Sequence, residues 1–327
     1  MEQRNVVLLS LDGGGARGAL TAEFLRLLEN DATASIYDTF DFFAGVSTGA
    51  IIAAFCASNR EDMSFLAERV YSPEHLSKVF DKSSWDRILG RMQNQPVYNG
   101  ITKAEHFEQL FGETRLDDIR DKRLLVLAYD FINREVAVFK NGTASHNPTL
   151  KELIDAATAA PTLYPPVGIR ESESRWLIDG AIATNDPSVI AISEALAMGY
   201  ALENIWVISL GTGHPEHDLS QEQCDAIGNE AKHWGMVEWV ANGLFDHMMT
   251  GSSSISEYQC RQLLGDRYLR VNDYLPRDLL HLDKTDPETV AGLKEQAGLW
   301  FNEHRDSIFD LLGRAGSCKQ RERLRCV

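Results

Sequence analysis

Near its N-terminus the chain runs twice from a strand-like apolar segment, through a glycine-rich turn, into a helix-like segment. Val6–Leu11 is typical of a buried strand, glycines occupy positions 13 to 15, and apolar residues then recur at helical spacing. The second unit has a short strand at Phe40–Ala44, the turn Gly45–Gly49 and a helix of small and apolar residues at Ala50–Ala57. Units of this kind build sheets that helices cover on both faces, so the sequence predicts an α/β fold.

The same alternation continues up to about Gly213. Further elements are predicted as strands at Leu124–Tyr129, Glu135–Phe139, Trp176–Ile178 and Ile205–Leu210, and as a helix at Leu150–Ala160. Beyond Gly213 the strand signals fade, and Glu216–Gly313 is predicted to be mostly helical. We therefore expect a three-layer α/β/α sandwich with a mainly parallel central sheet. Its α/β core would span residues 1–213 and a helical part packed on it residues 214–313, followed by a solvated basic tail at 314–327.

Composition excludes several partners and sites. The formal net charge of −16 argues against a nucleic-acid partner, because affinity for phosphate backbones comes mostly from Lys and Arg. The five cysteines are scattered without a CxxC pair, so neither a disulfide framework nor a zinc site is predicted. The charged start Met1–Arg4 leaves no room for a secretory signal, and the least polar run, Ala44–Ala57, is too short to cross a bilayer. These features predict cytoplasmic residence.

The second glycine turn, Gly45-Val46-Ser47-Thr48-Gly49, has the G-x-S-x-G spacing. A serine at the apex of a strand-to-helix turn needs small neighbours and exposes its hydroxyl above the end of the sheet, where it can act as a nucleophile. The helix N-terminus adds partial positive charge there. The alternative is that Ser47 merely caps the helix.

The first glycine turn allows two interpretations. Backbone N–H groups at a helix start can bind either a nucleotide phosphate or the oxyanion of an acyl-transfer reaction. Gly13, Gly15 and Gly18 satisfy G-x-G-x-x-G, and Asp38 is spaced to contact a ribose, so a dinucleotide site stays open. Against it, Asp12 would place a carboxylate beside the pyrophosphate, whereas a polarised carbonyl tolerates that neighbour better.

The general base has two candidates. Asp179 ends a predicted strand and precedes Gly180-Ala181, which allows close approach to a neighbouring turn, although most Asp-Gly pairs serve only as turns. His214 follows the strand Ile205–Leu210, and the order Ser47, Asp179, His214 is that of α/β-hydrolases. His214 and His217 are not expected to bind a metal, because Pro215 interrupts a regular helical face and no third ligand is indicated.

Taken in order, three segments resemble the signature blocks of the patatin-like phospholipase family. They are Asp12–Gly18, Gly45–Gly49 and Asp179–Ala181, with further similarity at Ala160–Pro166 and Asn185–Pro187. The resemblance covers Val6 to about Gly313. It implies that Ser47 is the nucleophile and Asp179 its sole side-chain partner, without a histidine. It also implies an oxyanion hole formed by Gly13, Gly14 and Gly15 with Arg17 in support, and a nucleophile elbow with Gly45, Thr48 and Gly49.

The resemblance further implies the substrate and the partners. The substrate would be a membrane phospholipid or a lysophospholipid, with water as the acyl acceptor, peripheral membrane contact during catalysis, and no metal or cofactor. Some bacterial relatives are activated by cyclic nucleotide signals in defence, which makes a cyclic nucleotide a candidate activator here, and a homo-oligomer is left open.

The segment His233–Met249 carries an apolar stripe that is expected to pack in the core, with Trp239 off the stripe as a candidate for lipid contact. Its members are Trp234, Val237, Ala241, Leu244, Phe245 and Met248.

Overall fold

The computed structural model describes residues 4–32, 34–58, 62–80, 96–143, 147–170, 174–215 and 219–323. An eight-stranded sheet forms its centre, with strand order β5-β6-β3-β2-β1-β7-β9 and β4 also paired to β3. The strands are β1 (Val6–Leu11), β2 (Phe42–Val46), β3 (Arg123–Asp130), β4 (Glu135–Lys140), β5 (Val167–Arg170), β6 (Ser174–Asp179), β7 (Ile205–Leu210) and β9 (Tyr268–Val271). The run from β3 through β2, β1 and β7 to β9 is parallel, whereas β4, β5 and β6 pair antiparallel. This confirms the mainly parallel sheet.

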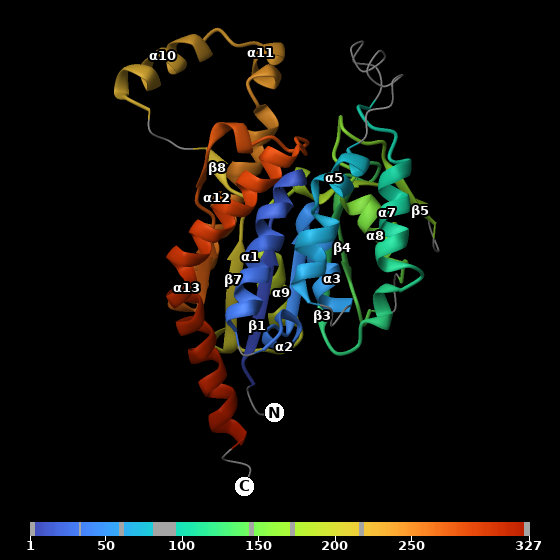
Figure 1. Cartoon of the computed structure of the whole chain (residues 1–327), viewed down its shortest axis with the longest axis vertical. Helices are drawn as coiled ribbons and strands as arrows, with labels where there is room; N and C mark the ends of the chain where they lie inside the picture. The colour runs from blue at the N-terminus through green and yellow to red at the C-terminus, as the bar shows by residue number, and fades with distance from the viewer. Residues whose placement is uncertain are drawn as a thin grey trace.

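Helices cover both faces of the sheet, which confirms the three-layer arrangement (Figure 1). Val7 and Leu9 of β1 pack in one apolar cluster, and Val6 and Leu8 pack in a second cluster on the opposite face. The helices that contribute to the first cluster include α1 (Gly18–Asp31), α3 (Thr48–Ser58), α7 (Ile101–Phe111), α8 (Leu150–Ala157) and α13 (Pro287–Arg323). Those of the second are α9 (Ser188–Ala197) and α12 (Leu244–Leu264).

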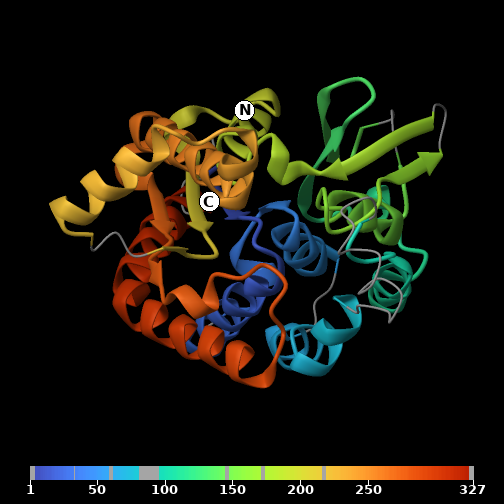
Figure 2. The ribbon, with the colours of Figure 1, turned by 90° about the horizontal axis from the view of Figure 1, so that it is seen from above.

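The two N-terminal units lie at the centre of the molecule. Seen from above, the blue N-terminal elements stand between the red helix α13 and the green elements (Figure 2). Helix α3 is apolar around nearly its whole circumference, and accordingly almost every residue from Thr48 to Ala57 is buried. A buried helix at the centre gives the turn before it a rigid support.

The register of the strands along β3 brings two chain segments together. Val46, the last residue of β2, lies opposite Leu127, and Asp179, the last residue of β6, lies opposite Ala128. Strand β4 occupies the other edge of β3 over Leu125–Asp130. Since a strand has only two edges, β2 and β6 share one edge of β3 and their ends meet.

The segment after Gly213 differs in part from the prediction. Tyr268–Val271 forms the strand β9 and joins the main sheet beside β7, where mostly helix was expected. The strand escaped prediction because it is short and carries a charged residue, Arg270, which is buried. Helix α13 continues to Arg323, past the predicted end of the helical part. The division of the chain at Gly213 stays a prediction.

The apolar stripe of His233–Met249 does not pack in the core, so that prediction is wrong. Val237, Phe245 and Met248 expose 77%, 46% and 53% of their surface. Gly243 adopts a left-handed conformation (φ 82°) and separates α11 (Met236–Ala241) from α12, so the predicted stripe does not lie on one continuous helix. Figure 1 shows α10 (Gln221–Ala231) and α11 standing out from the body at the end opposite the two termini. Within the described ranges, no helix has the length and hydropathy needed to cross a membrane.

Candidate active site

Ser47 sits on a strained turn between β2 and α3. Its φ of 54° lies in the left-handed region, which is costly for a residue with a side chain and is held here by the packing around it. A Cβ atom added to Gly49 would lie 2.6 Å from the carbonyl oxygen of Asp12 and closer still to that of Leu11. A Cβ on Gly45 would lie 2.6 Å from the backbone nitrogen of Ala50. Both glycines are therefore required by close backbone approach, and the turn is pressed against the end of β1.

The first glycine turn lies beside Ser47. The amide of Gly13 donates to the carbonyl of Asn185 at 3.3 Å, so it is already paired. Gly14 and Gly15 border the same cavity as Ser47, and within the described part of the chain no group accepts from their N–H groups. Arg17 donates to the carbonyl oxygens of Gly14 and Gly213 at 3.3 and 3.1 Å and so holds the turn.

Asp179 approaches from the third segment. Its carboxylate accepts a hydrogen bond from the amide of Ala181 at 2.9 Å, and its own amide donates to the carbonyl of Ala159 at 3.0 Å. Burial raises the pKa of Asp179 to about 6, against the lowering effects of a hydrogen bond with Ser47, the amide of Ala181 and the charge of Lys103. Gly180 permits this position, because a Cβ there would lie 2.6 Å from the carbonyl oxygen of Leu127 on β3.

These groups open into one cavity of about 460 Å³. Ser47, Asp179, Gly14 and Gly15 stand at one part of its wall, and much of the remainder is aliphatic or aromatic. The apolar members of the wall include Ile51, Val70, Leu76, Phe80, Phe107, Leu163, Tyr164 and Ile182. A cavity of this size and lining suits an apolar chain with a reactive polar group at one end.

The structure does not bring His214 to this site. It lines a separate cavity of about 260 Å³, its Nε2 lies 3.1 Å from the carbonyl oxygen of Asn272, and its ring packs edge-on against Tyr274. His217 lies outside the described residues. His106 and His281 do line the cavity of Ser47, and no motif in the sequence indicated either of them. Burial lowers the pKa of His106 to about 4, so its ring is neutral near pH 7.

A buried ion pair supports the first glycine turn from behind, and the sequence did not predict it. Arg270 on β9 donates to both carboxylate oxygens of Asp12, at 2.8 and 2.5 Å, and to Ser209 at 2.7 Å. Burial raises the pKa of Asp12 to about 7, and Arg270 holds part of that rise back. Because the Asp12 carboxylate is paired with Arg270, it does not face the cavity of Ser47.

Protein groups cover part of the first glycine turn. The amide of Ala16 donates to the carbonyl of Leu282 at 2.7 Å, and a Cβ on Gly14 would lie 2.6 Å from the Cβ of Thr212. Leu282, Asn185 and Thr212 thus occupy part of the space around the turn, which disfavours the dinucleotide interpretation.

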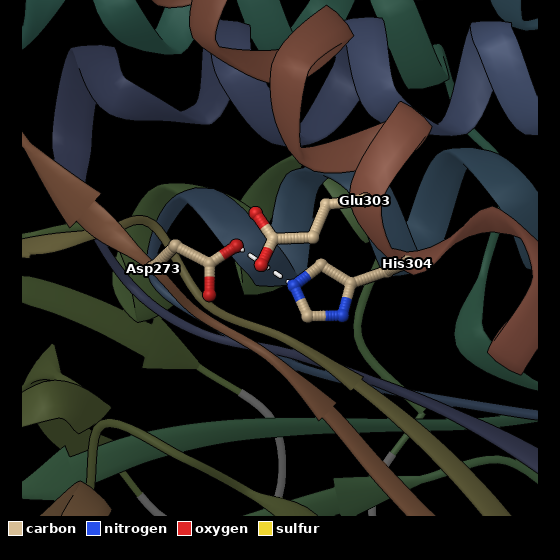
Figure 3. A group of neighbouring side chains, drawn as sticks. All are labelled: Asp273, Glu303 and His304. Atoms are coloured by element: carbon tan, nitrogen blue, oxygen red, sulfur yellow. Dashed lines mark hydrogen bonds and ion pairs between the residues drawn. The ribbon is translucent and has the colours of Figure 1, made fainter.

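One group of described side chains has the donor atoms for a metal ion. The ligand atoms of Asp273, Glu303 and His304 lie within 4.8 Å of one another, and His304 Nε2 is 2.8 Å from Asp273 Oδ2 (Figure 3). None of the three borders the cavity that holds Ser47. They can contribute no ligand to a metal at the candidate active site.

Comparisons with known proteins show the family of the chain. A family model described as patatin-like phospholipase matches residues 9–192, more than half of the chain. Patatin-like protein 4 from Arabidopsis thaliana is 28% identical over 88% of this chain and 81% of its own length. Patatin-17 from Solanum cardiophyllum is 29% identical over 82% of this chain and 76% of its own length. Human GIVD cytosolic phospholipase A2, solved with methyl gamma-linolenyl fluorophosphonate, shares the fold at 12% identity, with a TM-score of 0.53 over 97% of this chain and 60% of its own. The chain therefore belongs to the patatin-like phospholipase family of lipid acyl hydrolases.

Proposed function

We propose that this protein hydrolyses fatty acyl esters of phospholipids or lysophospholipids with Ser47 as nucleophile and Asp179 as general base. The observation that carries the proposal is the register on β3, where the ends of β2 and β6 meet on one edge. Support also comes from the buried carboxylate of Asp179, whose raised pKa of about 6 makes it a better proton acceptor than an ordinary aspartate.

In the first half of the reaction, Ser47 Oγ attacks the acyl carbonyl carbon while its proton passes to Asp179. The negative charge moves to the carbonyl oxygen, which the amides of Gly14 and Gly15 stabilise. Donors of this kind are each worth about 3 to 4 kcal/mol in the transition state. The tetrahedral intermediate then collapses, the ester C–O bond breaks, and Asp179 returns the proton to the leaving alkoxide.

In the second half, water attacks the acyl-serine and gives its proton to Asp179. Collapse of the second tetrahedral intermediate releases the fatty acid and returns the proton to Ser47 Oγ. Because Gly13 already donates to Asn185, we assign the oxyanion to Gly14 and Gly15 and give Gly13 and Arg17 supporting roles.

The surroundings of the cavity support a lipid substrate. Val240, Phe245 and Met248 line the cavity and also expose 50%, 46% and 53% of their surface, so the apolar wall continues to the outside. We propose that this surface, with Trp239 beside it, contacts the membrane peripherally during catalysis. The net charge of −16 favours zwitterionic over anionic lipid surfaces.

Release of free fatty acid from phosphatidylcholine and lysophosphatidylcholine vesicles tests this function. Ser47→Ala and Asp179→Asn should each abolish release, whereas His214→Ala and His106→Ala should retain most of it. All four proteins should keep the same melting temperature within a few degrees. Absence of fatty acid release by the wild type from both lipids would contradict the substrate class, and collapse of activity in either histidine variant would contradict the two-residue mechanism.

A cyclic nucleotide activator and a role in bacterial defence belong to the same proposal. The cavity of about 260 Å³ is connected to the active site, because it is lined by Arg17 and Gly213, which support the first glycine turn. The test is fatty acid release with and without a panel of cyclic mono- and dinucleotides. A rate unchanged across the panel would remove the activator from the proposal.

A further inference from the structure

The cavity of Ser47 contains a buried lysine that the proposed chemistry does not use. Lys103 on α7 exposes only 2% of its side chain and borders the cavity together with Ser47 and Asp179. A lysine is rarely buried unless it is paired, because its charge must leave water. The burial of Lys103 therefore requires a structural or functional explanation.

All the donors of Lys103 are directed at the end of helix α8. Nζ donates to the carbonyl of Asp155 at 2.8 Å and to Thr158 Oγ1 at 3.1 Å, and it lies 2.9 Å from the Asp155 carboxylate. The ring of Tyr164 lies 4.5 Å from Nζ and closes another side of the ammonium group. A cation at the C-terminus of a helix also interacts favourably with the helix dipole.

The end of α8 is connected directly to Asp179. Ala159, the residue after Thr158, accepts the hydrogen bond from the amide of Asp179. Lys103 thus fixes the end of α8, and Ala159 just after it binds the amide of Asp179, the last residue of β6. A second connection is electrostatic, since the positive charge of Lys103 acts on the Asp179 carboxylate and opposes the effect of burial.

The groups that hydrogen-bond the carboxylate do not replace this charge. Ser47 and the amide of Ala181 contact Asp179 as neutral donors. The remaining titratable residues of the cavity wall are Tyr71, His106, Tyr164, Asp246, His281 and Asp283. The pKa of His106 is lowered to about 4, so this ring brings no positive charge near neutral pH.

We propose that Lys103 is a positioning residue of the active site, which anchors the end of α8 behind Asp179 and keeps its carboxylate in the ionised form that accepts the serine proton. The proposal rests on the role assigned to Asp179 above. This role explains why a lysine is buried in an otherwise largely apolar cavity wall.

The test is the dependence of kcat/KM on pH for two variants that remove the charge of Lys103. Lys103→Met keeps the length and apolar stem of the side chain but removes the charge. Its acid limb should move to higher pH, because the charge of Lys103 no longer lowers the pKa of Asp179. A shift of half a unit would lower kcat/KM about two-fold near pH 6, with a much smaller loss at pH 8.5. Lys103→Gln also removes the charge but keeps a polar donor for the end of α8, so its acid limb should move in the same direction.

Lys140→Met is the matched control, because Lys140 pairs with Glu194 at 2.6 Å and does not border the cavity. Its acid limb should stay in place. Acid limbs of Lys103→Met and Lys103→Gln that coincide with the wild type would overturn the proposal, as would a shift to lower pH. If Lys103→Met does not fold, Lys103→Gln alone decides. An active Asp179→Asn variant would instead refute the proposed function, which separates the two failures.

Discussion

The contact between the nucleophile turn and the end of β1 leads to a prediction for Gly49→Ala. The added methyl group would lie 2.6 Å from the carbonyl oxygen of Asp12 and closer to that of Leu11. Both are backbone atoms, so no side chain can move to relieve the clash. To restore an ordinary van der Waals distance, α3 and β1 must separate by about 1 Å. Overpacking of this kind costs roughly 1–3 kcal/mol of folding free energy.

The separation matters for activity because β1 leads into the first glycine turn and α3 begins directly after Ser47. The two elements carry the oxyanion donors and the nucleophile, and a misplacement of about 1 Å between reacting groups can cost on the order of 10²-fold in rate. We therefore expect kcat/KM on a p-nitrophenyl acyl ester to fall by about that factor while the protein stays folded.

Gly298→Ala provides the control for Gly49→Ala. Gly298 lies within α13, and a Cβ there meets nothing within 4 Å. The same substitution should leave kcat/KM unchanged and stabilise the helix by up to about 1 kcal/mol. Melting temperatures and esterase rates of both variants should be measured side by side. A Gly49→Ala variant with wild-type activity would refute the close approach on which this reasoning depends.

Two further predictions concern charged groups. Asp179 must be ionised to accept a proton and its pKa is raised to about 6, so kcat/KM should fall as pH falls through about 6 and reach roughly a tenth of its plateau at pH 5; a rate that stays flat down to pH 4.5 would contradict this value. Arg270→Met removes one partner of a buried ion pair, so urea unfolding should show a loss of about 3–5 kcal/mol, and adding Asp12→Asn should recover part of it. A loss below about 1 kcal/mol in the single variant would show that the pair contributes little.

Much of the fold could be predicted because its central elements have strong local patterns. Val6–Leu11 and Ile205–Leu210 are continuous apolar runs, and both form central strands with the predicted bounds. The turn at Ser47 was also predictable, since G-x-S-x-G between a strand and a helix of small residues has few other uses. Such signals are contained within about twenty residues and do not depend on distant partners.

The parts that could not be predicted depend on contacts between distant segments. Nothing in the local sequence near Arg270 indicates that Asp12, 258 positions earlier, forms its ion pair. The exposure of Val237 and Phe245 is equally hidden, because an apolar stripe looks the same whether it faces a core or the outside. The place of Lys103 in the site could not be predicted for a similar reason, since only the fold brings it to the same cavity as Asp179.

The most direct test of the account is covalent labelling with an alkyl fluorophosphonate, followed by mass spectrometry of the proteolysed protein. We expect one phosphonyl adduct, on the peptide that contains Ser47, with no adduct in Ser47→Ala and a much slower reaction in Asp179→Asn. An adduct on another side chain, or an Asp179→Asn variant that reacts as fast as the wild type, would contradict the claim that these two residues act together.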